Sequence, residues 1–287
     1  MTILRSYLKS ARLRRRLSFA EDFFVLDRSE IREGAKRRQF PTPVSIIYTA
    51  FAQILEFSSA GSVASRESQE SEKQDKDETA VVHFLNDYLQ WILDEVGFVR
   101  TLDDRLVTLQ NRTPPFSKGL RLHAVEVVCK TDGSVVVALD SGAKSKATPT
   151  HFPIFKECKR LLHRKPEDSI VGQVAAELLS IVQFGQEQKH HDNPEAFGIL
   201  LHHRHAQIVS ACFSEGYLDK LETAHPTIDF GQGDFFAIKT TRTYDLAIVS
   251  DRREFTIAVM SLFKYVVSGR ARIGRLDELK TENAINM

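Results

Sequence analysis

Two acidic residues and a lysine lie at the ends of two apolar segments, which are predicted to form consecutive strands. Asp140 directly follows the first segment, and Glu157 and Lys159 end the second. Because side chains alternate along a strand, Glu157 and Lys159 share one face while Cys158 points to the other. Carboxylates on neighbouring strands can bind a hard divalent ion, and a lysine beside them can orient or deprotonate a water molecule. The pattern therefore indicates metal-assisted hydrolysis of a phosphodiester.

The elements that must position these residues follow from periodicity and turn chemistry. Apolar residues recur at helical spacing in two segments, with three strand-like segments between them and one after them. Thr131-Asp132-Gly133 has the composition of a hairpin turn that joins the first two strands. Gln173 lies near the start of the second helix, where it can reach the lysine, the water or a phosphate. The expected order is helix 79–97, strands near 120–130, 134–140 and 152–159, helix 169–184 and strand 197–202.

The sequence of motifs is similar to that of a known family. Asp140, then Glu157-Cys158-Lys159, then Gln173 in the next helix resembles the PD-(D/E)XK nuclease superfamily, which includes restriction-endonuclease-like and RecB-like enzymes. The helix bearing Gln173, followed by Phe197-Gly198-Ile199-Leu200-Leu201, also resembles the nuclease-like domains common in fungal proteins. The resemblance implies an α/β fold with a restriction-endonuclease-like core, in which helices flank a mixed central sheet. Leu139 stands where the strict motif has proline.

The resemblance also implies a cofactor and a role for each residue. Mg²⁺ or Mn²⁺ is expected, with Asp140 and Glu157 as metal ligands and Glu95 of the preceding helix completing the site. Lys159 is expected to orient or activate the attacking water, and Gln173 to complete the catalytic set. Dimerisation is common among such nucleases, so a homodimer is one expectation.

A local excess of positive charge follows the first acid. Residues 141–165 contain seven lysines and arginines but only one acidic residue, Glu157, although the net charge of the whole chain is only +1. Such an excess beside carboxylates can hold a phosphodiester backbone, so nucleic acid, with DNA preferred, is the expected partner. The alternative is an ordinary solvated surface. The candidate phosphate-binding residues are Lys144, Lys146, Lys156, Arg160, Arg164 and Lys165.

The chain divides into three predicted parts. Residues 1–57 read as a helical extension with an N-terminal end rich in arginine, which is either a nuclear address, a nucleic-acid arm or an exposed helical face. Residues 58–79 are rich in serine, glutamate and lysine and have little to bury, so they are expected to form a flexible linker or loop. Residues 80–280 are the expected nuclease-like domain.

Composition points to an intracellular protein, in the nucleus or cytoplasm, that is neither secreted nor bound to a membrane. No apolar run approaches the ~18 residues of a membrane span, and no secretory signal follows Met1. The three cysteines are widely separated in apolar segments, which favours reduced core residues. A histidine cluster at 202–205 lacks a cysteine or carboxylate at ligand spacing, so a zinc site is not favoured.

Two other interpretations of the central residues stay open. One is a catalytically inactive module of the same fold that binds nucleic acid or a protein. The other is an unrelated α/β scaffold in which Glu157-Cys158-Lys159 is accidental. The latter predicts that Asp140 and Glu157 lie far apart. A separation of more than roughly 8 Å excludes one shared ion, because its ligand bonds are only about 2.0–2.6 Å long.

Overall fold

The computed structural model describes most of the chain from residue 67 onward. The predicted N-terminal extension at 1–57 lies outside it, and for Glu95, Asp140 and Lys159 it describes the backbone alone. The described residues are 67–96, 99–100, 106–113, 115–122, 125–140, 148–159, 167–223, 231 and 233–276.

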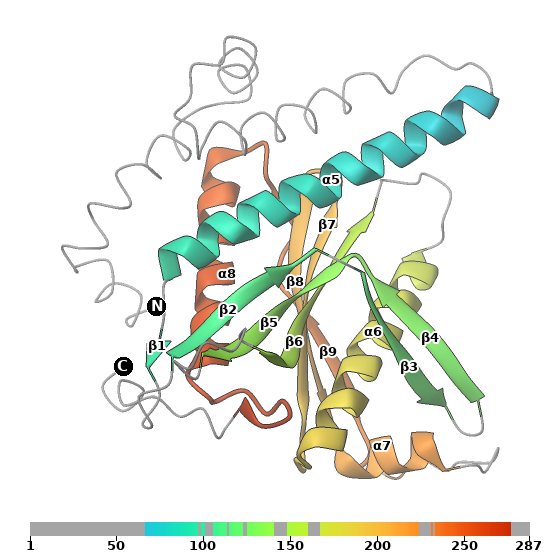
Figure 1. Cartoon of the computed structure of the whole chain (residues 1–287). Coiled ribbons are helices and arrows are strands. Elements are labelled where there is room, and N and C mark those ends of the chain that lie inside the picture. Colours follow the sequence, from blue (N-terminus) through green and yellow to red (C-terminus); the bar gives the residue numbers. More distant parts are fainter. Residues whose placement is uncertain are drawn as a thin grey trace.

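A mixed sheet forms the centre of the fold (Figure 1). Its strand order is β1-β2-β5-β6-β7-β8-β10, with β9 also paired to β8. The pair β6–β7 is parallel and the other pairs are antiparallel. The strands are β1 Val99–Arg100, β2 Leu106–Arg112, β5 Gly133–Asp140, β6 Thr148–Lys159, β7 Glu195–His202, β8 His205–Phe213, β9 Phe236–Thr240 and β10 Tyr244–Asp245.

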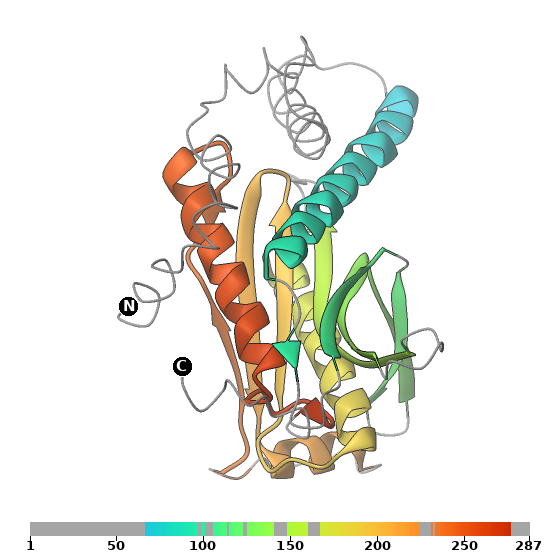
Figure 2. The same ribbon diagram turned by 60° about the vertical axis from the view of Figure 1, so that its left-hand side comes forward.

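Four helices cover the two faces of this sheet, as Figures 1 and 2 show. The long helix α5 (Glu67–Val96) and α8 (Val249–Val267) pack on one face, in a core that includes Ile154 and Cys158 of β6. The helices α6 (Glu167–Gln188) and α7 (Glu215–Glu222) pack on the other face, where Phe155 of β6 is buried. None of the described helices has the length and apolarity needed to cross a membrane.

This arrangement confirms the predicted fold class, an α/β fold with helices on both faces of a mixed sheet. A parallel pair needs a long crossover, and α6 provides it between β6 and β7. Strand β6 therefore lies inside the sheet, with an antiparallel neighbour on one side and a parallel neighbour on the other. Residues at its end lie between the sheet and the start of α6.

A separate two-stranded ribbon is inserted in the chain between β2 and β5, which are neighbours in the main sheet. The strands β3 (Phe116–Leu122) and β4 (Val125–Thr131) pair only with each other among the described residues. Two predictions are therefore wrong. The segment near 120–130 is two strands rather than one, and Thr131-Asp132-Gly133 joins two different sheets rather than forming a hairpin. The strand β2, which does pair with β5, lies in a segment rich in turn residues that was not expected to form a strand.

The helix that precedes the sheet is longer than its apolar stripe. It begins at Glu67, so the predicted flexible linker is wrong for residues 67–79, while 58–66 lie outside the described residues. Glutamate, glutamine and lysine are strong helix formers even where nothing is buried. Their spacing also suits a helix, since Glu72 and Lys76 are four residues apart.

Candidate metal centre

The register between β5 and β6 decides which acid can accompany Glu157. Gly133 pairs with Lys156 at one end of this antiparallel pair, and Leu139 pairs with Thr148 at the other. Asp140 therefore lies at the far end from Glu157. A strand rises about 3.3 Å per residue, so the two backbones are roughly 20 Å or more apart. The predicted pairing of Asp140 with Glu157 around one ion is wrong, and this separation is the one that the unrelated-scaffold interpretation predicted.

A different aspartate lies beside Glu157. Asp132 immediately precedes Gly133, the first residue of β5, which pairs with Lys156 of β6. The backbone N–H of Asp132 donates to the Lys156 carbonyl at 3.0 Å, and its Oδ2 accepts from the Cys158 N–H at 2.6 Å. Asp132 is thus held between the residues on either side of Glu157.

Helix α6 adds an amide and a second carboxylate to this end of the sheet. The Nε2 group of Gln173 donates to Glu157 Oε1 at 2.6 Å and to Glu177 Oε1 at 2.9 Å. Both carboxylates are almost fully buried, with 2% of Glu157 and 1% of Glu177 exposed. Gln173 was expected to reach the lysine, the water or a phosphate, and among the described side chains it bonds to the carboxylates of Glu157 and Glu177. Burial raises the pKa of the Cys129 thiol on β4, and the nearby Glu177 raises it further.

Lys156 is not on a phosphate-binding surface, so this prediction is wrong. It is only 1% exposed and shares the face of β6 that carries Cys158, toward α5 and α8. Its ammonium group donates to Oδ1 of Asn86 on α5 and, at 2.5 Å, to Oδ1 of Asn111 on β2. Burial lowers its pKa to about 8, although Cys158 and Asp132 oppose this. The positive charge therefore holds the helix and two strands together behind the cluster of carboxylates.

The other predicted residues lie mostly outside the described side chains. The backbone of Lys159 pairs with His202 of β7, two residues beyond the pairing of Glu157 with Leu200. Glu95 lies in the last turn of α5. The predicted phosphate-binding residues Lys144, Lys146, Arg160, Arg164 and Lys165 lie outside the described residues altogether.

The donors in this cluster suit a hard divalent ion. Asp132, Glu157 and Glu177 offer carboxylate oxygens, which Mg²⁺ and Mn²⁺ prefer to nitrogen or sulfur. Asp132 Oδ1 has no hydrogen-bond partner among the described residues, while Oδ2 is held by Cys158. Across the described part of the chain, no three histidine, cysteine or acidic side chains are close enough to form a complete site. Two protein carboxylates with water in the remaining positions is an arrangement that Mg²⁺ commonly accepts.

Asp132 was missed because the acidic partner of Glu157 was sought at the end of β5, where Asp140 lies, rather than at the start of β5. Two consecutive antiparallel strands bring the start of the first beside the end of the second. Glu157 lies near the end of β6, so its partner had to be sought just before β5, at Asp132. That signal was available in the sequence, since Thr131-Asp132-Gly133 immediately precedes the apolar run.

Comparisons with known proteins identify no relative. No family model matches the chain, and neither a curated protein nor a solved structure is significantly similar to it.

Proposed function

We propose that the protein is a metal-dependent nuclease whose site contains Asp132, Glu157, Lys159 and Gln173. The observation that supports this proposal most is that Asp132 bonds to the residues on either side of Glu157, while Gln173 bonds to the Glu157 carboxylate. The order of elements adds support. A helix, three antiparallel strands of one sheet, a helix and a parallel strand occur in the order expected of a PD-(D/E)XK core, with the β3–β4 ribbon inserted.

Each residue has a role that follows from its chemistry. Asp132 and Glu157 would hold Mg²⁺ or Mn²⁺, which when bound polarises a phosphodiester and lowers the pKa of water. Gln173 fixes the orientation of Glu157 through a neutral donor, so it adds no competing charge. Lys159 retains its predicted role of orienting or deprotonating the attacking water. The proposed substrate is nucleic acid, with DNA preferred.

Plasmid cleavage by the full chain in the presence of Mg²⁺ or Mn²⁺ tests this function. We expect cleavage that disappears with EDTA and falls by about 100-fold or more in Lys159→Ala, because general acid–base groups contribute about 10²–10⁴-fold. Cleavage that survives Lys159→Ala unchanged would exclude the proposed mechanism. Calorimetric titration with Mn²⁺ measures metal binding separately from activity.

One observation favours a second function, a catalytically inactive module of the same fold. Glu157 is 2% exposed and shares its amide donor with the buried Glu177, so a substrate phosphate has little access to it in this conformation. This alternative predicts that Mn²⁺ titration gives no heat from the wild-type protein. It also predicts that nucleic acid or protein binding, if present, is unaffected by Lys159→Ala.

A further inference from the structure

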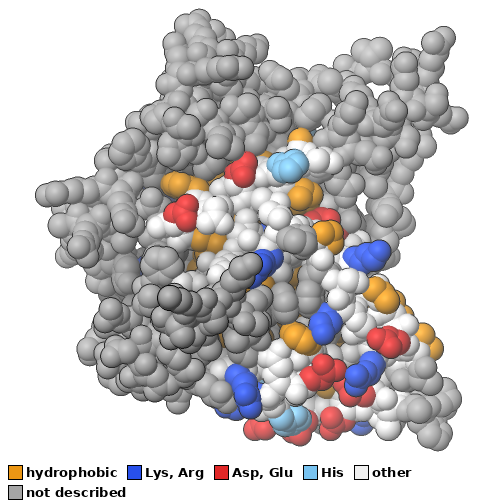
Figure 3. Space-filling view, in the orientation of Figure 1, with side chains coloured by type: hydrophobic (Ala, Val, Ile, Leu, Met, Phe, Trp, Pro, Cys, Tyr) orange, Lys and Arg blue, Asp and Glu red, His pale blue; other side chains and the backbone are white. Residues whose placement is uncertain are grey.

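The outer edge of strand β4 is exposed and apolar. Val125 and Val128 are 60% and 62% exposed, and Val127 between them is also exposed. Among the described residues β4 pairs with β3 alone, so its other edge meets no strand. Figure 1 places β4 on the outside of the molecule, and Figure 3 shows hydrophobic side chains beside acidic and basic ones on that side. An exposed edge of this kind is a template for pairing with another strand.

Hydrogen bonds on the opposite edge of the ribbon show which residues of β4 present their backbone outward. The Arg121 N–H donates to Gln183 Oε1 at 2.9 Å, and Gln183 Nε2 donates to the Arg121 carbonyl at 2.8 Å. Arg121 therefore directs both groups away from β4. In an antiparallel pair, opposite residues either exchange both bonds or neither, and the two types alternate. Since Arg121 pairs with Glu126, the outward-directed residues of β4 are Glu126, Val128 and Lys130.

These three residues are self-complementary about Val128. If two copies of β4 pair antiparallel with Val128 opposite its own copy, each Glu126 lies opposite a Lys130. This pairing joins outward-directed residues throughout and gives two ion pairs related by symmetry. Moving the centre to Val127 places Glu126 opposite Val128, and moving it to Cys129 places Glu126 opposite Asp132. Of these three registers, only the pairing centred on Val128 matches opposite charges.

We propose that the protein forms a twofold dimer in which β4 pairs with β4 of a second copy, centred on Val128. The two ribbons then form one four-stranded antiparallel sheet. Val128 meets its own copy on the same face as the two Glu126–Lys130 pairs, since residues two apart share a face of a strand. A second copy is the partner because Glu126 and Lys130 are equally spaced on either side of Val128. Each charge therefore meets its opposite when the edge pairs with itself. The interface does not depend on nuclease activity.

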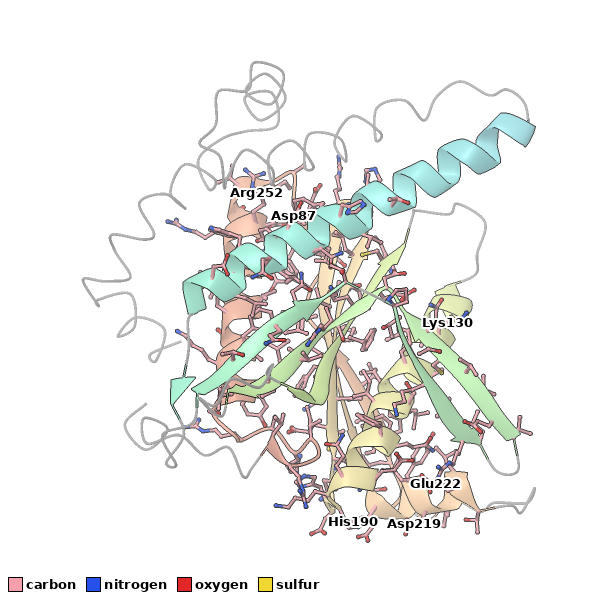
Figure 4. All side chains as sticks on the ribbon, viewed as in Figure 1. Asp87, Lys130, His190, Asp219, Glu222 and Arg252 are labelled. Carbon is pink, nitrogen blue, oxygen red and sulfur yellow. The ribbon has the colours of Figure 1, made fainter. Side chains whose placement is uncertain are left out.

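Exchanging the charges tests the register. Sedimentation or light scattering of the full chain, over about 1–100 µM, is expected to show a wild-type dimer of modest affinity, as befits a small interface. Glu126→Lys and Lys130→Glu should each raise the dissociation constant about tenfold or more, because each creates two like-charge pairs. The double variant restores both pairs in reverse and should dimerise like the wild type. Asp219→Lys, on the outside of α7 (Figure 4), is the matched control and should change nothing.

A proline at the centre tests the backbone pairing independently. Val128 directs its N–H away from β3, so Val128→Pro, present in both copies, removes two hydrogen bonds of the dimer but none of the ribbon. We expect a monomer whose circular dichroism matches that of the wild type. A wild-type monomer across the whole range would overturn the proposal, as would a dimer that both Glu126→Lys and Val128→Pro leave intact. Failure of the double variant to recover dimerisation would overturn the register centred on Val128.

Discussion

Asp132 bonds to both sequence neighbours of Glu157, since its N–H donates to the Lys156 carbonyl at 3.0 Å and its carboxylate accepts from the Cys158 N–H at 2.6 Å. Asp140 lies at the other end of β5. The two aspartates therefore provide a matched pair for mutation, since they lie at opposite ends of β5 and only Asp132 is near Glu157.

The first prediction separates these two aspartates. Asp132→Asn should weaken Mn²⁺ binding and nuclease activity by about 100-fold or more, because altering even a supporting residue of a metal site costs about 10–100-fold. Asp140→Asn should leave both within about twofold of the wild type. Calorimetric titration and plasmid cleavage measure the two quantities. Loss of Mn²⁺ binding in Asp140→Asn but not in Asp132→Asn would contradict the assignment.

The second prediction concerns the amide that joins the two buried carboxylates. Gln173→Ala removes the donor to Glu157 and Glu177, so Mn²⁺ affinity should fall by about 10–100-fold. The free energy of unfolding should also fall by about 1–3 kcal/mol, since buried acceptors lose a donor. Val171→Ala, at an exposed position two residues earlier on α6, is the control and should alter neither quantity. Equal behaviour of the two variants would remove Gln173 from the site.

The third prediction follows from the buried amine of Lys156. Burial lowers its pKa from 10.5 to about 8, so between these values the unfolded chain holds a proton that the folded protein has released. Stability must therefore rise as the pH increases from about 8 to about 10.5, by up to about 3 kcal/mol from this residue. Below pH 8 the lysine is charged in both states, and its contribution does not change.

Urea unfolding at several pH values, with wild type and Lys156→Met, measures this effect. The variant should lose the part of the rise that Lys156 contributes, and it should be less stable at pH 7 because Asn86 and Asn111 lose their donor. Lys264, whose pKa burial also lowers to about 8, contributes a similar rise in both proteins and cancels in the difference. Identical pH dependence in the two proteins would show that the Lys156 amine is not titrating in this range.

The fourth prediction compares a glycine in a crowded position of a strand with a glycine in an open position of a helix. A Cβ at Gly198 of β7 would lie 2.2 Å from the buried ring of Phe155, whereas one at Gly172 of α6 would meet no atom within 4 Å. Gly198→Ala should therefore destabilise the protein by about 1–3 kcal/mol or more. Gly172→Ala should stabilise it by about 0.4–1 kcal/mol, because alanine restricts the unfolded chain and favours the helix. Thermal or urea unfolding measures both.

Local patterns predicted most of the elements of this fold. The apolar stripes of α5 and α6 and the run at 134–139 indicated helices and strands where the structure has them. Contact between Gln173 and Glu157 was also predictable, since the helix following β6 must return across the sheet to begin a parallel strand. These inferences depend on neighbours in the sequence and on one crossover.

The errors arose where a residue's partner lies far away in the chain. Lys156 looks like one of several surface lysines, and only the positions of Asn86 and Asn111 show that it is buried. Asp140 has the sequence context of a strand-end acid, but its distance from Glu157 depends on the register of β5 and β6. Strand β2 was missed because the turn residues that follow it dominate the segment. The periodicity of apolar residues shows which face of a strand is buried, whereas the register of a strand pair depends on the positions of both strands.

The double hydrogen bond between Gln183 and Arg121 has a consequence for how large an assembly can become. One side chain of α6 occupies the backbone groups that a further strand would need at this position of β3, so the ribbon can be extended on the β4 side only. In a twofold contact, both molecules use the same edge. When β4 pairs with its own copy, both open edges are occupied, and a third molecule has no edge to pair with. Mutating Gln183 to alanine would free the N–H and carbonyl of Arg121, and growth through that edge as well as through β4 would be open-ended. We therefore expect Gln183 to limit assembly to a finite complex and to prevent the growth of a fibre.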